Sequence, residues 1–439
     1  MTVALVSFDG TERCRGALAA PDRYRTLRAQ LDGGGTCAVR GAGLSYCQAS
    51  AAEGATTLSS RHFDRLLAFD PDRLRVTVEP GVTVGDLLRF AVAHDAVFPV
   101  LPGHPSITVG GCAGFNVHGK TQHDVGHFSD HVLELTLLHP DHGELICNRD
   151  EHADVFDLTL GGMGLTGWIA SLTLQLAPLP GHSVRRTVHR AGSLAEAAGL
   201  MASLRDSGDD GDALYAWNDL NRRGDHFGRG MVYVEAYEES RRSDRVRYRR
   251  LEPGPRGRLR LGGSRVVTEA VNLGYRARDR WGRGALRSVE DAAFPINGNE
   301  VYYRLFGRRG FREYQMVVPT AAWPAAVGEV ERAVRESGVP VTLGSLKLFA
   351  GRPRLLWFRA DGVCLTIDAA DGERSRRLFA RLDALAREHG ALVNLSKDSR
   401  VGAETVRAVY PGYDEFRRRL HDFDPERRFD SMLRRRIGV

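Results

Sequence analysis

The sequence predicts an α+β protein with a glycine-rich N-terminal domain followed by a second α+β domain. Short strand patterns alternate with helical patterns over the first 180 residues, and most of the charge appears after Pro180. A length of 439 residues with 42% hydrophobic content also favours two or three domains and a large core. We place the domains at 1–180 and 181–391, followed by a C-terminal segment, 392–439.

The N-terminal elements follow from local periodicity. Apolar spacing predicts helices over 22–31 and 86–94, and Thr83 is expected to cap the second of these, with Asp86 three residues on. The stretch 106–119 is rich in glycine and nearly free of charge, so we expect it to be buried against another surface. Short apolar or alternating runs predict strands at 36–40, 56–60, 66–70, 74–84, 132–138 and 144–147.

The stretch "GGMGLTG" (161–167) has the G-x-G-x-x-G spacing of a dinucleotide-binding Rossmann domain. In a Rossmann domain a helix must follow these glycines, whereas here 168–176 alternates polar and apolar residues as a strand does. The acidic residue expected about 20 positions later is also missing, since 184–189 contains no Asp or Glu. The Rossmann interpretation is therefore excluded. The glycines either approach a flat or anionic group closely or form a tight hairpin without a ligand.

In the second domain, periodicity predicts strands at 230–236 and 313–318 and helices at 323–337 and 373–388. The densest basic stretch runs from Arg241 to Arg265 and contains glycines and prolines. We interpret it first as a surface loop and second as a contact for phosphate or anionic lipid.

Composition excludes several classes of protein. No apolar run reaches the roughly 18 residues of a membrane span, and no signal segment is evident, so we expect a cytoplasmic protein with at most peripheral membrane contact. Six cysteines without C-x-x-C pairs indicate neither a metal site nor a disulfide framework, only reduced and mostly buried thiols. The net charge is +6, but no stacking aromatics interleave with the basic residues, so no nucleic-acid partner is expected.

Lysine is the rarest of the common charged residues in this chain. Of 61 basic residues only Lys120, Lys347 and Lys397 are lysine. A lysine can persist where a compact, titratable ammonium fits and a forked guanidinium does not. The alternative is that three surface lysines survived by chance in an arginine-biased sequence.

Three segments together, "VRGAGLSY", "LPGHPSITVGGCAGFNVHGK" and "GGMGLTG", resemble the vanillyl-alcohol oxidase family of flavoproteins. The resemblance implies a PCMH-type FAD-binding domain of two α+β subdomains, a separate α+β substrate (cap) domain, and a C-terminal segment that returns to the FAD-binding domain. Further segments, among them "FREYQMVVP", "LKLF" and "SKDSR", are most similar to family members that oxidise the 2′-hydroxyl of decaprenylphosphoryl-ribose with a partner reductase. All three lysines lie inside the matched segments.

The resemblance also implies site residues. His118, Lys120 and Lys397 would be catalytic, and both His118 and Lys397 are candidates for the base. The residues implied to line the substrate pocket are Gln315, Lys347, Phe349, Cys364 and Thr366. Those implied to bind FAD are Arg40, Gly41, Ala42, Gly43, Leu44, Ser45, Tyr46, Gly103, Ser106, Thr108, Gly110, Gly111, Gly114, Asn116, His118, Gly119, Gly162, Gly164, Gly167, Ile169 and Lys397.

Three positions depart from the family pattern. Leu44 stands where covalent members carry a histidine, so we expect FAD to be bound without a covalent bond. Thr366 and Asn394 stand where the closer relatives carry cysteine and tyrosine, which bears on the substrate more than on the cofactor. Structural alternatives remain for three sites: His118 as a core histidine, Lys347 as a lysine snorkelling from a strand, and Asp398 with Arg400 as a surface ion pair.

The resemblance implies that FAD takes a hydride from a secondary hydroxyl of a sugar or sugar-like molecule, giving a ketone. A furanose or related cyclic polyol is the expected kind of substrate, and the basic stretch from Arg241 to Arg265 favours a phosphorylated or nucleotide-like form. The ketone is either the product or one half of an epimerisation completed by a separate NAD(P)H-dependent reductase. The alternatives are a sugar lactone or alditol oxidase, and a protein that binds FAD without turnover.

Overall fold

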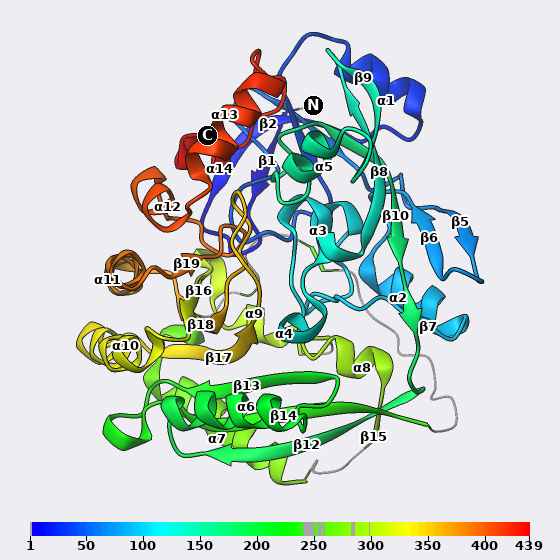
Figure 1. Ribbon diagram of the computed structural model, residues 1–439. Coiled ribbons are helices and arrows are strands. Elements are labelled where there is room, and N and C mark those ends of the chain that lie inside the picture. The colour runs from blue at the N-terminus through cyan, green and yellow to red at the C-terminus, as the bar shows by residue number, and fades with distance from the viewer. Residues whose placement is uncertain (1, 240–250, 253–256, 258–259, 282–285, 298) are drawn as a thin grey trace.

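The computed structural model describes residues 2–239, 251–252, 257, 260–281, 286–297 and 299–439. Figure 1 shows two smaller sheets in the upper half of the molecule and a longer sheet that extends across the lower half. No helix within these residues is long and apolar enough to cross a membrane. All six cysteines are free and buried, as predicted.

The first sheet has the strand order β1-β2-β4-β3 and is mixed. β1 pairs antiparallel with β2, whereas β2 and β3 each pair parallel with β4. The strands are β1 (Thr2–Val6), β2 (Arg13–Ala19), β3 (Cys37–Arg40) and β4 (Thr56–Ser59), and helix α1 (Tyr24–Leu31) connects β2 to β3. The buried Leu27 and Leu31 of α1 join a core cluster with Leu58 of β4, so one face of the helix covers this sheet.

The second sheet has the strand order β5-β6-β10-β8-β9 and is antiparallel. Its strands are β5 (Leu66–Asp70), β6 (Arg75–Val78), β8 (Val132–His139), β9 (Gly143–Asn148) and β10 (Trp168–Gln175). β10 directly follows the "GGMGLTG" stretch, so the prediction of a strand there is confirmed. The neighbouring elements are α2 (Val84–Ala93), α3 (Val109–Phe115), α4 (Gln122–Val125), α5 (Ala153–Thr159) and the short pair β7 (Ala96–Val97) and β11 (Ala177–Pro178).

Two helix starts show how the sequence sets local structure here. The Thr83 side chain accepts a hydrogen bond from the Asp86 N–H at the start of α2, which confirms the predicted cap. The stretch 106–119 is largely buried, as predicted, but part of it forms α3, which the sequence analysis did not predict. Thr108 caps α3 by accepting from the Gly111 N–H, and the glycines of the helix hid its apolar periodicity.

In the described part of the chain, eight strands form the long sheet in the order β15-β12-β14-β13-β17-β18-β16-β19, with antiparallel pairing. The strands are β12 (Ser183–Ala191), β13 (Ala213–Asp219), β14 (Arg229–Glu238), β15 (Leu286–Ser288), β16 (Phe311–Pro319), β17 (Val341–Phe349), β18 (Gly362–Ala370) and β19 (Leu392–Val393). The helices of this region are α6 (Leu194–Ser207), α7 (Arg265–Trp281), α8 (Val289–Ala293), α9 (Val301–Arg304), α10 (Trp323–Ser337) and α11 (Glu373–His389).

The long sheet has one apolar face and one mixed face. Because side chains alternate along a strand, Tyr314 and Met316 of β16 point into a core cluster that also contains residues of α6, α10 and α11. Their neighbours Glu313 and Gln315 point to the opposite face, toward the glycine-rich half of the chain. This mixed face supplies polar side chains to the functional site.

The C-terminal segment begins with β19 in the long sheet and ends against the first sheet. It forms α12 (Ala403–Val409), α13 (Tyr413–Phe423) and α14 (Met432–Ile437), and Figure 1 shows α13 and α14 near β2. Phe429 forms a parallel bridge with Cys37 of β3, and the Met432 N–H donates to the Ala51 carbonyl at 2.9 Å. The predicted domain limits at residues 180 and 391 stay a prediction.

The basic stretch predicted as a loop, 241–265, lies largely outside the described residues. Of its described part, Leu251 packs in a cluster with Phe8 and Tyr46, and its N–H donates to the Ser106 hydroxyl at 3.0 Å. The proposed contact of this stretch with phosphate or lipid stays a prediction.

Candidate functional site

A cavity of about 690 Å³ lies between the glycine-rich segments and the mixed face of the long sheet. This volume is in the usual range for cofactor and substrate sites. The predicted site residues that line it are Gly41, Ala42, Gly43, Leu44, Ser45, Tyr46, Gly103, Thr108, Gly110, Gly111, Gly114, Asn116, His118, Gly119, Lys120, Gly164, Gly167, Ile169, Gln315, Lys347, Thr366 and Lys397. The fold therefore brings together residues as far apart in the chain as Gly41 and Lys397.

The first glycine segment packs against the second at Gly41. A Cβ atom at Gly41 would lie 2.2 Å from Oγ1 of Thr108, the side chain that caps α3. Gly43 has a φ of +67°, and a Cβ there would overlap the Arg40 guanidinium. Both positions leave bare backbone at the cavity wall.

The second and third glycine segments are joined by main-chain hydrogen bonds. The Met163 N–H donates to the Gly114 carbonyl at 2.7 Å, and the Gly161 N–H donates to the Ala113 carbonyl at 2.9 Å. Gly167 has a φ of +140°, and a Cβ there would lie 2.7 Å from the Leu138 carbonyl oxygen. The motif connects helix α5 to strand β10, so the alternative of a hairpin turn is wrong, and the turn forms a wall of the cavity.

Several buried polar atoms at this wall have no hydrogen-bond partner within the described residues. The side chains concerned all line the cavity and are Ser60, Asn116, Thr159, Thr166 and Trp168. Buried donors without partners are costly, so they indicate a ligand rich in acceptors. Glycine-walled backbone next to such donors fits the ring system and phosphates of FAD.

The opposite wall carries a row of polar side chains from paired strands. The Gln315 amide donates to Oγ1 of Thr366 at 2.9 Å, and its Oε1 accepts from the Asn394 amide at 2.5 Å. All three residues are buried and line the cavity. The two positions that depart from the closer relatives, Thr366 and Asn394, are thus linked through Gln315.

Lys397 lies where this row meets the first glycine segment. Its Nζ is 3.7 Å from the centroid of the Tyr46 ring and 3.5 Å from Oε1 of Glu313. The Tyr46 N–H also donates to the Ser396 carbonyl at 2.9 Å, which ties the two segments together. An ammonium held in this way can stabilise negative charge that develops on a neighbouring ligand.

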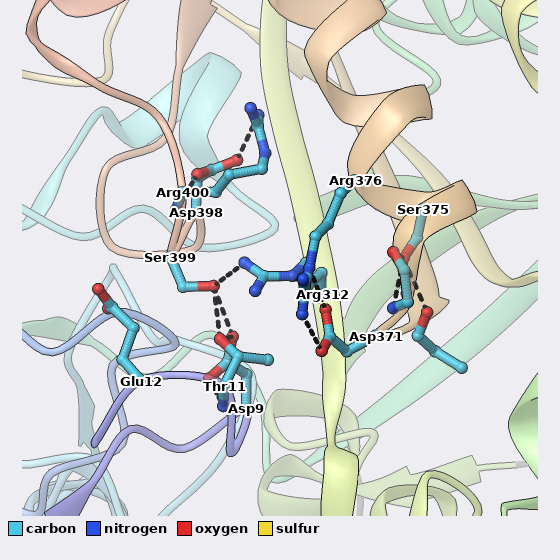
Figure 2. Close-up of polar contacts among 12 residues, drawn as sticks. Asp9, Thr11, Glu12, Arg312, Asp371, Ser375, Arg376, Asp398, Ser399 and Arg400 are labelled. Carbon is cyan, nitrogen blue, oxygen red and sulfur yellow. Dashed lines mark hydrogen bonds and ion pairs between the residues drawn. The ribbon is translucent and has the colours of Figure 1, made fainter.

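Buried polar contacts hold the segment that follows Lys397 (Figure 2). The Ser399 hydroxyl donates to Oδ2 of Asp9 at 2.8 Å and accepts from Nη1 of Arg312 at 2.9 Å, and Arg312 pairs with Asp371 at 2.6 Å. Arg400 binds Asp398, whose side chain is 1% exposed. The predicted alternative of a surface ion pair at Asp398 and Arg400 is therefore wrong, since this pair is part of the support of the site.

His118 lies at the cavity wall among aromatic rings. Its ring centroid is 4.7 Å from that of Phe349 and 5.7 Å from that of Phe358. Burial, and then the charges of Lys347, His127 and Lys397, lower the pKa of His118 well below its usual value, so the imidazole is neutral. Burial also lowers the pKa of Lys347, which faces the cavity instead of snorkelling to the outer surface.

Lys120 belongs to a cationic cluster in the same cavity. Lys120, Arg186 and Arg287 all contact the buried carboxylate of Glu235, at 3.0, 2.7 and 3.2 Å respectively. Lys120 also lies over the Tyr215 ring, 4.5 Å from its centroid. Burial outweighs the attraction of Glu235 and lowers the pKa of Lys120 to about 8.

Five predicted residues lie behind the cavity wall. Arg40 donates to the Ser50 hydroxyl at 2.7 Å, Ser106 accepts from Leu251, and a Cβ at Gly162 would strike the Leu158 carbonyl. Phe349 packs on His118, and Cys364 pairs across the strands with Lys347. These residues support the lining instead of forming it.

Sequence reasoning missed several lining residues, namely Arg186, Tyr215, Arg287, Tyr302, Glu313 and Asp368. A signal existed for two of them, because Glu313 stands two residues before Gln315, and Asp368 two after Thr366, on the same face of a strand. The others come from elements whose position relative to the cavity depends on tertiary packing.

Comparison with known proteins agrees with this geometry. Residues 25–147 match the family described as "FAD binding domain". The chain is 28% identical over 432 residues to decaprenylphosphoryl-beta-D-ribose oxidase of Mycolicibacterium smegmatis, covering 94% of this chain and 91% of the relative. It is 32% identical over 386 residues to an uncharacterised protein of Streptomyces coelicolor, covering 82% of this chain and all of that protein.

A solved structure shows the same fold. The crystal structure of 6-hydroxy-D-nicotine oxidase from Arthrobacter nicotinovorans superposes with a TM-score of 0.61 at 21% sequence identity, covering 92% of this chain and 87% of that one. The glycine-walled cavity, the unpartnered donors and these matches lead to one conclusion. The chain belongs to the vanillyl-alcohol oxidase family of FAD-dependent oxidoreductases, with a PCMH-type FAD-binding domain.

Proposed function

We propose that this oxidoreductase converts a secondary hydroxyl of an anionic, sugar-like substrate into a ketone. The observation that carries the proposal is the cationic cluster of Lys120, Arg186 and Arg287. These three cations share one carboxylate, Glu235, among the side chains that the structure describes around them. A partly buried cluster with surplus positive charge favours an anionic ligand group such as a phosphate.

The relative from Mycolicibacterium smegmatis is named for a phosphorylated ribose, which supports a furanose carrying phosphate as the substrate class. Thr366 and Asn394 differ from the pattern of such relatives and lie at the polar wall, so we expect this sugar or its substituent to differ. A nucleoside phosphate fits the same charge.

FAD, when bound, supplies the oxidant that takes a hydride from the substrate carbon. The protein groups then have separate tasks. The cationic cluster would hold the anionic group, and the row of Thr366, Gln315 and Asn394 would orient the sugar hydroxyls by hydrogen bonds. Lys397 would stabilise the negative charge that reduction places nearby.

A ketone made in this way can be the final product or one half of an epimerisation. In the second case a separate NAD(P)H-dependent reductase would act on the released ketone. That reductase would act in the next reaction step, and the two proteins would not need to be in contact.

Anaerobic flavin bleaching tests the proposal. Purified FAD-loaded protein would be mixed with matched pairs of sugars, each with and without a phosphate, while the absorbance of oxidised flavin is followed. We expect bleaching by a phosphorylated or nucleotide-like furanose and slower bleaching by its neutral counterpart. Bleaching by neutral lactones or alditols alone would favour the alternative oxidase, and no bleaching by any alcohol would favour a protein that only binds FAD.

A substitution in the cationic cluster tests whether this cluster binds the anionic group of the substrate. Arg287→Met should raise the KM for the phosphorylated substrate about tenfold, the usual scale for one lost charge-assisted contact, and leave the KM for the neutral sugar nearly unchanged. An equal effect on both substrates would remove the cationic cluster from the proposal.

A further inference from the structure

Two acidic side chains, Glu313 and Asp368, lie side by side in the cavity. They are direct partners on the neighbouring strands β16 and β18, and both line the cavity wall. Glu313 is 5% exposed and Asp368 1% exposed. Two buried carboxyl groups in contact cannot both be ionised at low cost, so such a pair tends to hold one proton.

The atoms around the pair favour this arrangement. Tyr302 donates its hydroxyl proton to Oδ2 of Asp368 at 2.8 Å and lies 2.9 Å from Oγ1 of Thr342. Oδ1 of Asp368 is buried and has no hydrogen-bond donor among the described residues, and Oε1 of Glu313 is buried with only its ion-pair contact to Lys397, at 3.5 Å. A proton between the two carboxyl groups supplies a hydrogen bond to these atoms.

Charge decides which carboxyl keeps the proton. Burial, and then the negative charge of Glu313, raise the pKa of Asp368 well above its usual value. Glu313 is the carboxyl of the pair that contacts the Lys397 ammonium, at 3.5 Å. The other titratable groups that face the pair are Lys347, Tyr46, Tyr302 and Cys364. Asp368 is therefore the acid of the pair and Glu313 the carboxylate.

We propose that Glu313 is the catalytic base that accepts the proton of the substrate hydroxyl, and that Asp368 is its positioning residue. This inference rests on the proposed function. In the step, the O–H bond of the substrate breaks and its proton binds the Glu313 carboxylate, while the hydride leaves the carbon for FAD and the C–O bond becomes a carbonyl. One alcohol, one oxidised flavin and one carboxylate give one ketone, one reduced flavin and one carboxylic acid.

The two bases suggested by the sequence are weaker candidates. Lys397 is the cationic partner of Glu313, so it has no free electron pair while that ion pair persists. His118 is neutral, but a protonated His118 would place another cation beside Lys347, whose charge already opposes its protonation. Glu313, as the carboxylate of the pair, has an electron pair that can accept the substrate proton.

The first test measures flavin reduction by substrate in rapid mixing across pH. Glu313→Gln should keep its FAD and slow reduction by about 10²-fold or more, the usual contribution of a general base, and the loss of rate at low pH should disappear. Asp368→Asn should keep the loss at low pH but move its midpoint. Glu79→Gln is the matched control, because Glu79 is equally buried and ion-paired, with Arg65, but does not line the cavity.

A second measurement does not depend on turnover. Infrared difference spectra of the resting holoenzyme should show the carbonyl band of a protonated carboxyl near neutral pH that is lost in Asp368→Asn. In Glu313→Gln this band should disappear at a lower pH, because the negative neighbour is gone. The variants separate this signal from Asp9 and Asp383, whose pKa values are also raised by burial.

The outcomes separate this inference from the proposed function. If sugars bleach the wild-type flavin but Glu313→Gln is reduced within about threefold of the wild-type rate, the base is another group and the inference is overturned. If no alcohol bleaches the wild type, the proposed function and the base role both fail. The absence of a carboxyl band that depends on Asp368 would overturn the shared proton in either case.

Discussion

Lys397 is the residue whose environment most directly supports a role in the reaction. Its ammonium lies over the Tyr46 ring and beside Glu313, and the residues after it are held by buried contacts (Figure 2). A charge fixed before the reaction stabilises developing negative charge without reorganisation. The presence of a lysine at this position of an arginine-rich chain is then explained by a site that suits a compact ammonium.

We expect Lys397→Met to fold, retain FAD and reduce its flavin roughly 10²-fold more slowly, the scale of losing one preorganised charge. Lys397→Arg should recover little of this loss, because the planar guanidinium of arginine cannot take the place of the compact lysine ammonium in an enclosed site. Rapid-mixing kinetics with the same substrate measure both, and FAD content is the control for folding. A near-normal rate in the Met variant would contradict the role.

The lowered pKa of Lys120 predicts that anion binding depends on pH. Burial lowers its pKa to about 8, so its charge is present below pH 8 and lost as the pH rises through that value. The affinity for sulfate, an anion that does not itself titrate here, should therefore fall between pH 7 and pH 9. Arg186 and Arg287 stay charged across this range.

Titration calorimetry of the holoenzyme with sulfate checks this prediction. Lys120→Met should bind sulfate more weakly at pH 7 and lose the pH dependence, whereas Arg287→Met should bind more weakly at pH 7 but keep it. A pH dependence that survives in Lys120→Met would assign the titration to another group.

Single elements show what the sequence could and could not reveal. The alternation after "GGMGLTG" predicted β10, and the Thr83 cap predicted the start of α2, because both signals are local. β2 was not predicted, since its buried positions are small residues, Cys14 and Gly16, between exposed arginines. Helix α3 was not predicted because its glycines have low helix propensity. These glycines allow the helix to pack closely against other segments.

The contact of Gly41 with the α3 cap gives a prediction for these elements. In Gly41→Ala the new Cβ would overlap Oγ1 of Thr108, which must then release the Gly111 N–H. Loss of such a cap costs about 1 kcal/mol, so we expect FAD affinity to fall by about fivefold at most. Gly35→Ala is the control, because a Cβ at Gly35 meets nothing within 4 Å.

Fluorescence titration of the apoprotein with FAD measures both variants. Thr108→Ala removes the same cap without touching Gly41 and should match Gly41→Ala. Wild-type affinity in Gly41→Ala would show that the wall of the cavity adjusts without cost.

At the scale of the whole molecule, the cavity is assembled from segments that no local pattern connects. Phe8, Tyr46, Leu251, Tyr302 and Lys397 come from distant parts of the chain and reach one cavity through tertiary packing. The resemblance of the glycine-rich segments and of "SKDSR" to a known family located most of the wall. The cationic cluster and the acidic pair appear only when the long sheet places its mixed face against those segments.

This assembly leads to a prediction about the cofactor and stability. Leu44 cannot bond to the flavin, and none of the cysteines lines the cavity as far as the structure describes it, so FAD should be released by acid precipitation and appear in the supernatant.

Because FAD would contact several segments in the folded state alone, its removal should lower Tm, and added FAD should restore it. At 100 times Kd the stabilisation is about 2.7 kcal/mol. Thermal unfolding over a series of FAD concentrations measures this. Flavin that stays in the washed pellet, or a Tm that does not depend on FAD, would contradict non-covalent binding between these segments.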